Sequence, residues 1–188
     1  MVKAIIFDCF GVLYQGSLEH LMDRCPSENK SQLKDLSIAS DYGYVSRQEY
    51  HQTAAALLGM AEAEIESIIA LSHVRNVALI DDVRRRRLTH KIALLSNIGQ
   101  DVMNTLFTSQ EFDELFDVVV LSSDVGMVKP NPEIYEYTAS KLGVQPSECV
   151  MVDDLAMNVD GATSTGMQGV RYVSFKQYAR DIDKMFDN

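Results

Sequence analysis

The chain has 188 residues, enough for one well-buried domain with a modest insertion but short for two independent domains. Its formal net charge is -10, and because nucleic-acid affinity comes mainly from Lys and Arg neutralising phosphates, no nucleic-acid partner is expected. The three widely spaced cysteines form no CxxC pair, and the first apolar run is too short for a signal peptide or a membrane span, so a cytoplasmic protein without a membrane partner is expected.

Short apolar runs predict the strands. The first covers residues 4–7, and further runs cover 92–95, 118–121, 150–152 and 170–173. Because most of these runs lack polar alternation, they indicate strands covered on both faces, and the segments between them are long enough for crossover helices. The sequence therefore predicts an α/β fold with a doubly wound, mainly parallel sheet.

An insertion follows the first strand. About eighty residues separate it from the second strand, whereas a crossover needs roughly a dozen. Segments 28–40, 46–58 and 61–72 have the spacing of amphipathic helices, and Gly59 separates the last two. We expect residues 14–84 to form a small helical cap, and residues 1–13 and 85–188 to form the core.

Local signals predict the helices of the second half. Asn131 stands at an N-cap position, Pro132 suits the first helical turn and Gly143 suits a C-terminal stop, so a helix is expected over 132–142. Two more are expected over about 100–107 and about 155–165. The basic run 84–87 has the pattern of a solvated helix face.

Polar residues close the predicted strands. In a parallel α/β sheet the carboxyl ends of the strands share one edge, where ligands collect. Carboxylates gathered there destabilise the fold unless a cation balances them. The sequence thus predicts a metal and phosphate site built from the strand-end residues, which are Asp8, Ser96, Asn97, Ser122, Ser123, Asp124, Asp153 and Asp154, with Lys129 nearby.

Four segments of the chain contain most of these residues: FDCFGVL at 7–13, LLSN at 94–97, VKPNPEIY at 128–135 and VDDLAMNVDGA at 152–162. In these segments, and in their order and intervals, the chain resembles the haloacid dehalogenase (HAD) superfamily. The insertion also falls where that superfamily places its helical cap. The resemblance implies a Rossmann-like core and a hydrolase of the phosphatase-like branch, similar to sugar-1-phosphate phosphatases and acting on a small phosphorylated molecule.

The resemblance also implies roles for the phosphate-binding residues. Asp8 would be the nucleophile and would form an aspartyl phosphate. Ser96 would donate a hydrogen bond to a phosphoryl oxygen, and Lys129 would neutralise charge. Asn97 and Gly11 would complete the substrate-binding set, Gly11 by allowing a tight turn after the strand.

A magnesium ion is the implied cofactor. Its protein ligands would be Asp8, Asp154 and the main-chain carbonyl of Phe10, with Asp153 as a further ligand or a supporting group. Asn158, one helical turn after Asp154, would support these ligands. Because Mg²⁺ prefers oxygen ligands and keeps several waters, so small a set of protein oxygens is sufficient.

Phe10 departs from the family pattern, since most phosphatases of the superfamily have a second Asp there as general acid and base. Such catalysis contributes typically ~10²–10⁴ in rate, so turnover is expected to be slow unless another group serves. Three readings stay open: a phosphatase for substrates with good leaving groups, a metal-independent 2-haloacid dehalogenase, and a non-catalytic binding or regulatory module. Asp153 and Asp154 count against the dehalogenase. The sequence sets neither the substrate nor the oligomeric state.

Overall fold

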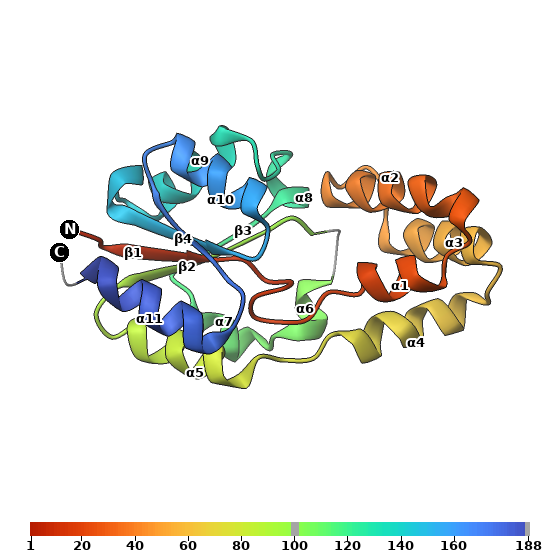
Figure 1. Cartoon of the computed structure of the whole chain (residues 1–188), viewed down its shortest axis with the longest axis horizontal. Helices are drawn as coiled ribbons and strands as arrows, with labels where there is room; N and C mark the ends of the chain where they lie inside the picture. Colours follow the sequence, from red (N-terminus) through yellow and green to blue (C-terminus); the bar gives the residue numbers. More distant parts are fainter. Residues whose placement is uncertain (99–101, 187–188) are drawn as a thin grey trace.

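A parallel sheet forms the centre of the core. Over the residues that this computed structural model describes, 1–98 and 102–186, the sheet has five strands in the order β3-β2-β1-β4-β5, and every pair is parallel (Figure 1). The predicted fold class is therefore confirmed. The strands are β1 (Ala4–Phe7), β2 (Lys91–Ser96), β3 (Val118–Leu121), β4 (Cys149–Asp153) and β5 (Gln168–Arg171).

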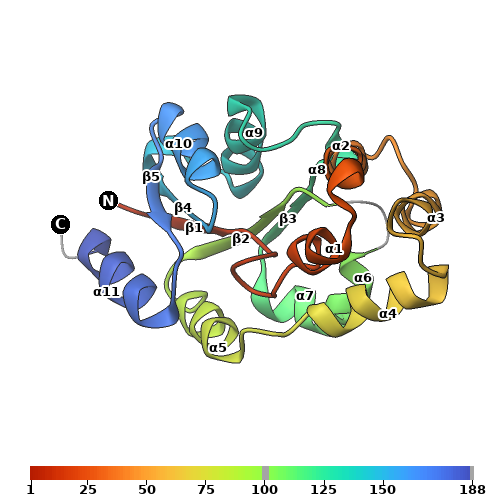
Figure 2. The ribbon, with the colours of Figure 1, turned by 45° about the vertical axis from the view of Figure 1, so that its right-hand side comes forward.

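Helices cover both faces of the sheet. Ile5 and Phe7 of β1 contribute to one apolar cluster, and Ala4 and Ile6 contribute to another, as expected from the alternation of side chains along a strand. α5, α7 and α11 lie on one side of the sheet, and α9 and α10 lie on the other (Figures 1 and 2). The core helices are α5 (Val77–Arg86), α6 (Met103–Leu106), α7 (Ser109–Leu115), α8 (Ser122–Val125), α9 (Pro132–Leu142), α10 (Ala156–Ser164) and α11 (Phe175–Phe186).

Four helices form a separate bundle at the end of the molecule far from the N-terminus and from α11 (Figure 1). Ser46 begins the third of them with a capping box to Glu49, and Gly59 ends it in the left-handed conformation. Their apolar side chains, such as Leu33, Ala54 and Ile65, pack in a cluster of their own. These helices are α1 (Leu18–Arg24), α2 (Lys30–Asp41), α3 (Arg47–Leu58) and α4 (Glu62–Ser72), with a 3₁₀ turn at Ser27–Asn29.

α5 packs on the core and not with this bundle. Leu79, Ile80 and Val83 belong to the cluster that covers one face of the sheet. This packing favours a cap boundary earlier than the expected one at residue 84. We propose that the cap ends near His73, before the segment in which Asn76 donates a hydrogen bond to the carbonyl oxygen of Val12 over 2.9 Å.

Three local predictions need correction. β5 runs from Gln168 to Arg171 instead of 170–173, because Gly169 lets the strand start against Val159 of α10, where a Cβ would come within 2.5 Å of a Val159 methyl. Asn131 holds the N-cap position of α9 but its side chain makes no capping hydrogen bond. α6 is shorter than the expected helix 100–107, and residues 100 and 101 lie outside the described residues.

The basic run 84–87 is only partly a solvated face. The Arg86 side chain is 12% exposed and bridges Asp82 and Asp183, while Tyr178 donates a hydrogen bond to Asp82. Arg86 therefore links α5 to α11 through its ion pairs with Asp82 and Asp183. Within the described ranges, no helix has both the length and the apolar character needed to cross a membrane.

Candidate active site at the carboxyl edge of the sheet

Three carboxylates that are distant in sequence meet at one edge of the sheet. β1 and β4 are neighbours with Phe7 opposite Val152, so the residues that follow, Asp8 and Asp153, come together. Asp154 adds a third carboxylate, and one oxygen from each residue lies within 4.8 Å of the others. Adjacent parallel strands thus bring together the carboxylates that the sequence placed at strand ends.

Lys129 lies between two of these carboxylates. Its ammonium nitrogen is 2.8 Å from Asp8 Oδ1 and 2.6 Å from Asp153 Oδ2, and the residue is 3% exposed. Burial alone would lower the pKa of Lys129, but the two carboxylates outweigh burial and raise it above the ordinary value. Lys129 is therefore a fixed positive charge in the site.

Asp8 is held by the backbone as well as by Lys129. Its Oδ1 accepts a hydrogen bond of 2.7 Å from the amide of Cys9. Burial raises the pKa of Asp8 to about 7, and the Asp153 carboxylate adds to this effect while Lys129 opposes it. The neighbouring thiol of Cys9 packs in the apolar cluster of the sheet, and burial raises its pKa well above the ordinary value, so thiolate chemistry is disfavoured.

Asp153 and Asp154 differ in their surroundings. Asp153 is fully buried, and its two oxygens accept hydrogen bonds from Lys129, the Leu155 amide and the side-chain amide of Asn158. Asn158 therefore supports Asp153, and no hydrogen bond to Asp154 is among its contacts. Asp154 is partly exposed, and burial raises its pKa, with the Asp153 charge as a further cause.

Gly11 makes room for the Asp154 carboxylate. A Cβ at this position would lie 2.3 Å from Asp154 Oδ2, and the backbone has φ +80°. A side chain at position 11 would therefore displace the Asp154 carboxylate. The Gly11 amide donates to the Tyr14 carbonyl over 2.7 Å, which closes the turn after β1.

Ser96 is the last residue of β2, the other neighbour of β1, and Asn97 follows it. The Ser96 hydroxyl is buried and has no hydrogen-bond partner among the described residues. The Asn97 side chain, in contrast, bonds the backbone of Lys129 twice, donating to its carbonyl over 2.9 Å and accepting from its amide over 2.8 Å. Ser96 thus has a free hydroxyl for a ligand, and Asn97 fixes the segment that carries Lys129.

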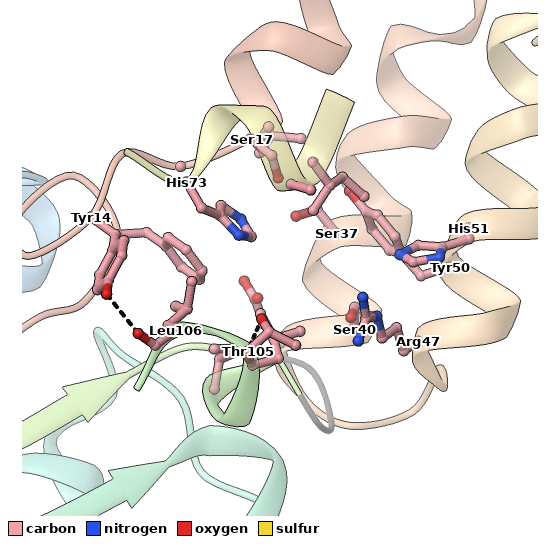
Figure 3. A pocket seen from close by; sticks show the side chains of 18 of the residues that line it. Tyr14, Ser17, Ser37, Ser40, Arg47, Tyr50, His51, His73, Thr105 and Leu106 are labelled. Carbon is pink, nitrogen blue, oxygen red and sulfur yellow. Dashed lines mark hydrogen bonds between the residues drawn. The ribbon is translucent and has the colours of Figure 1, made fainter. Parts of the chain in front are cut away.

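A cavity of about 370 Å³ opens between core and cap beside these residues. Phe10 lines it, and the Phe10 ring packs against the imidazole of His73 with ring centroids 4.9 Å apart. Figure 3 shows His73 pointing into this space and Tyr14 donating to the Leu106 carbonyl, a bond of 2.6 Å. The cavity walls combine residues of the core with side chains of α2, α3 and α4.

Sequence reasoning did not identify the cap side of this cavity. Polar and charged side chains face it from helices whose spacing showed only amphipathic character. A cavity-facing side chain cannot be told from a solvated one by periodicity, because both are polar. These residues are Ser37, Ser40, Asp41, Arg47, Tyr50, His51, Glu66 and His73.

Comparison with known proteins gives relatives of two kinds. A phosphatase from Mycobacterium tuberculosis is 36% identical over 90 residues, which is 47% of this chain and 41% of that protein, so the match spans less than half of the relative. An (S)-2-haloacid dehalogenase from Xanthobacter autotrophicus is 25% identical over 95% of this chain and 78% of that protein. Sequence similarity alone therefore does not choose between the two reactions.

Solved structures and a family model agree on the fold. A HAD family enzyme from Bacteroides thetaiotaomicron, crystallised with magnesium and inorganic phosphate, has a TM-score of 0.77 at 20% identity, with 93% of this chain and 96% of that chain covered. The sequence model of haloacid dehalogenase-like hydrolases matches residues 2–166. The chain belongs to the haloacid dehalogenase-like hydrolases.

Proposed function

We propose that this protein is a magnesium-dependent phosphatase that cleaves a small phosphorylated metabolite through a phosphoryl group carried on Asp8. One observation carries the proposal: Asp8, Asp153 and Asp154 lie together with an oxygen of each within 4.8 Å of the others, and Lys129 forms ion pairs with the first two. Three carboxylates and one ammonium leave two negative charges when all are ionised, which a divalent cation would balance.

The residues present fit magnesium. Asp8, Asp154 and the main-chain carbonyl of Phe10 would hold the ion, since all three offer oxygen ligands, while Asp153 and Asn158 hold their neighbours in place. When bound, the ion would supply positive charge that lowers the pKa of Asp8 and offsets the charge of a phosphate.

The remaining residues would bind and transfer the phosphoryl group. Asp8 would attack phosphorus, while Lys129 reduces the repulsion between the carboxylate and the phosphate. The unpartnered hydroxyl of Ser96 would donate a hydrogen bond to a phosphoryl oxygen. Water would then hydrolyse the phosphoaspartate and release inorganic phosphate.

Metal dependence is the direct test. With 4-nitrophenyl phosphate and a panel of sugar phosphates, we expect phosphate release in Mg²⁺ and a loss of at least about tenfold after EDTA treatment, because the three carboxylates would then face the phosphate with only Lys129 to oppose them. Calcium serves as the control, since its larger and more flexible coordination should not restore the full rate. Equal rates in EDTA and Mg²⁺ would contradict the proposal.

A 2-haloacid dehalogenase is the second candidate, favoured by the aromatic Phe10 and by the dehalogenase relative. In that reaction Asp8 would attack carbon and no metal would be needed. Asp154 would then have no metal ion to bind. Chloride release from 2-chloropropionate in EDTA would favour this candidate. Absence of turnover on every substrate would instead favour a non-catalytic binding module.

Replacing Gly11 by Ala should weaken magnesium binding. The new methyl group would occupy the space of the Asp154 carboxylate, and because that carboxylate ends a flexible side chain it can move away at small cost in stability. We expect a fall in Mg²⁺ affinity of about tenfold, the size of effect seen when groups that orient metal ligands are lost. Titration calorimetry with Mg²⁺ alone measures this without any substrate.

Gly166→Ala is the matched control for Gly11→Ala. Gly166 has φ +92° and an added Cβ would meet nothing within 4 Å, so it shares the backbone penalty of a left-handed residue without touching a carboxylate. Both variants should lose about 1–2 kcal/mol in the free energy of unfolding, and only Gly11→Ala should lose metal affinity. Equal Mg²⁺ affinity in the two variants would show that magnesium binding does not depend on the present position of the Asp154 carboxylate.

A further inference from the structure

The proposed phosphatase has no acid at position 10, next to the turn that follows the nucleophile. When the ester bond to phosphorus breaks, an alkoxide leaving group needs a proton, and Phe10 cannot supply one. Phe10 and the adjacent His73 ring line the same cavity, with ring centroids 4.9 Å apart. Other walls of this cavity carry side chains that can donate a proton.

Asp41 is a carboxyl group on the cap side of that cavity. It is the last residue of α2, is partly buried, and lines the cavity together with Phe10 and Asn97. Within residues 1–98 and 102–186, no side chain or amide forms a hydrogen bond or ion pair with its carboxyl oxygens. Asp8 and Asp153, in contrast, are both engaged by Lys129. Among the described residues, Asp41 is thus a carboxyl group without a hydrogen-bond partner, on the cap wall of the cavity that Phe10 and Asn97 line from the core.

The backbone of Asp41 is tied to the core edge that carries the site. The Ser122 hydroxyl, at the end of β3, donates to the Asp41 carbonyl and also accepts a hydrogen bond of 2.9 Å from the Ile98 amide. Close by, a Cβ on Gly43 would be 3.2 Å from the backbone of Ser123, so the segment after α2 is in contact with α8 there. The end of α2 is therefore held against the residues that follow Ser96, the last residue of β2.

The burial of Asp41 favours a carboxyl group that keeps its proton to a higher pH than an ordinary Asp does. Burial raises the pKa of Asp41 to about 7, and the ammonium of Lys129 opposes this shift. From the cap, Arg47 and Tyr50 of α3 and His73 line the same space (Figure 3). Burial and the charge of Arg47 lower the pKa of His73, so its protonated form is depleted at neutral pH. Asp41 is the better donor of the two.

We propose that Asp41 is the general acid of this enzyme, supplied by the cap in place of the acid missing at position 10. The inference rests on the proposed phosphatase function. As the bond from Asp8 to phosphorus forms and the ester bond breaks, the Asp41 proton passes to the leaving oxygen, and the product departs as an alcohol. The Asp41 carboxylate then takes a proton from the water that attacks the phosphoaspartate, which restores the acid and yields inorganic phosphate.

Leaving-group dependence tests this role. We expect Asp41→Asn to lower kcat/KM for glycerol 1-phosphate by ~10²–10⁴-fold and for 4-nitrophenyl phosphate by less than about threefold, because nitrophenolate departs without a proton. The quantity kcat/KM reports the steps up to leaving-group departure, so slow hydrolysis of the phosphoaspartate does not mask the difference. Asp35→Asn, an exposed residue of the same helix, is the matched control and should change neither value.

A second variant separates chemistry from structure. Phe10→Asp supplies a carboxyl group on the core side, and in the Asp41→Asn background it should restore kcat/KM for glycerol 1-phosphate by at least about tenfold. Equal losses on both esters, or no loss on either, would overturn the role of Asp41 and leave the phosphatase proposal intact. Wild-type protein inactive on both esters would overturn the phosphatase function itself, and this role with it.

Discussion

Asp8→Asn should lower metal-dependent phosphate release by on the order of 10³-fold or more, because the amide cannot attack phosphorus. The substitution preserves shape, so the Asn side-chain oxygen can still accept the Cys9 amide hydrogen bond now made by Asp8 Oδ1. Lys129 keeps Asp153 as a charged partner. The loss should therefore appear in turnover and not in the fold, and phosphate release with Mg²⁺ measures it.

The pH dependence of stability provides the control for this variant. The folded-state pKa of Asp8 is about 7 against an ordinary value of 3.8, so the folded wild-type protein binds the additional proton between these values. The contribution of Asp8 to the free energy of unfolding therefore falls as the pH rises from about 4 to about 7. Without metal, Asp8→Asn removes this loss and should be at least as stable as wild type in urea at pH 8. Wild-type turnover in the variant would exclude Asp8 as the nucleophile.

The sequence was a sufficient guide wherever one local signal decides the outcome. Pro132 and Gly143 set the ends of α9, and both bounds are as predicted. The carboxylates after β1 and β4 meet because those strands are neighbours, which follows once apolar runs are assigned to one parallel sheet. In such cases the chain positions alone determine which side chains share an edge.

Contacts between segments that are distant in the sequence could not be predicted from local patterns. α5 has an apolar face like the cap helices, and periodicity shows that a helix has such a face but not which body covers it. Asn97 was expected to bind substrate, yet its amide is engaged by the backbone of Lys129, 32 residues away. No sequence signal distinguishes Asp41 from other acids of the cap, because it lines the cavity only through the contact between the end of α2 and the core.

Lys129→Met should damage both stability and catalysis. Met fills much of the volume of the Lys stem, so the main change is the loss of a buried ammonium between Asp8 and Asp153. Removing one partner of a buried ion pair costs about 3–5 kcal/mol in the free energy of unfolding. Loss of a positive charge aimed at the reacting phosphate should lower kcat by about 10²–10³-fold. Urea unfolding and phosphate release measure the two effects separately.

The destabilisation by Lys129→Met should grow with pH. Without the ammonium, the pKa of Asp8 rises further above that of an unfolded Asp, so the folded variant retains a proton that the unfolded chain has lost, and stability falls as the pH increases. Unfolding measured in EDTA should therefore show a larger deficit at pH 8 than at pH 5.5. Lys34→Met, which removes an exposed charge from α2, should show neither the deficit nor its pH dependence. A constant deficit in Lys129→Met would mean that lost packing, and not the unbalanced carboxylates, accounts for the cost.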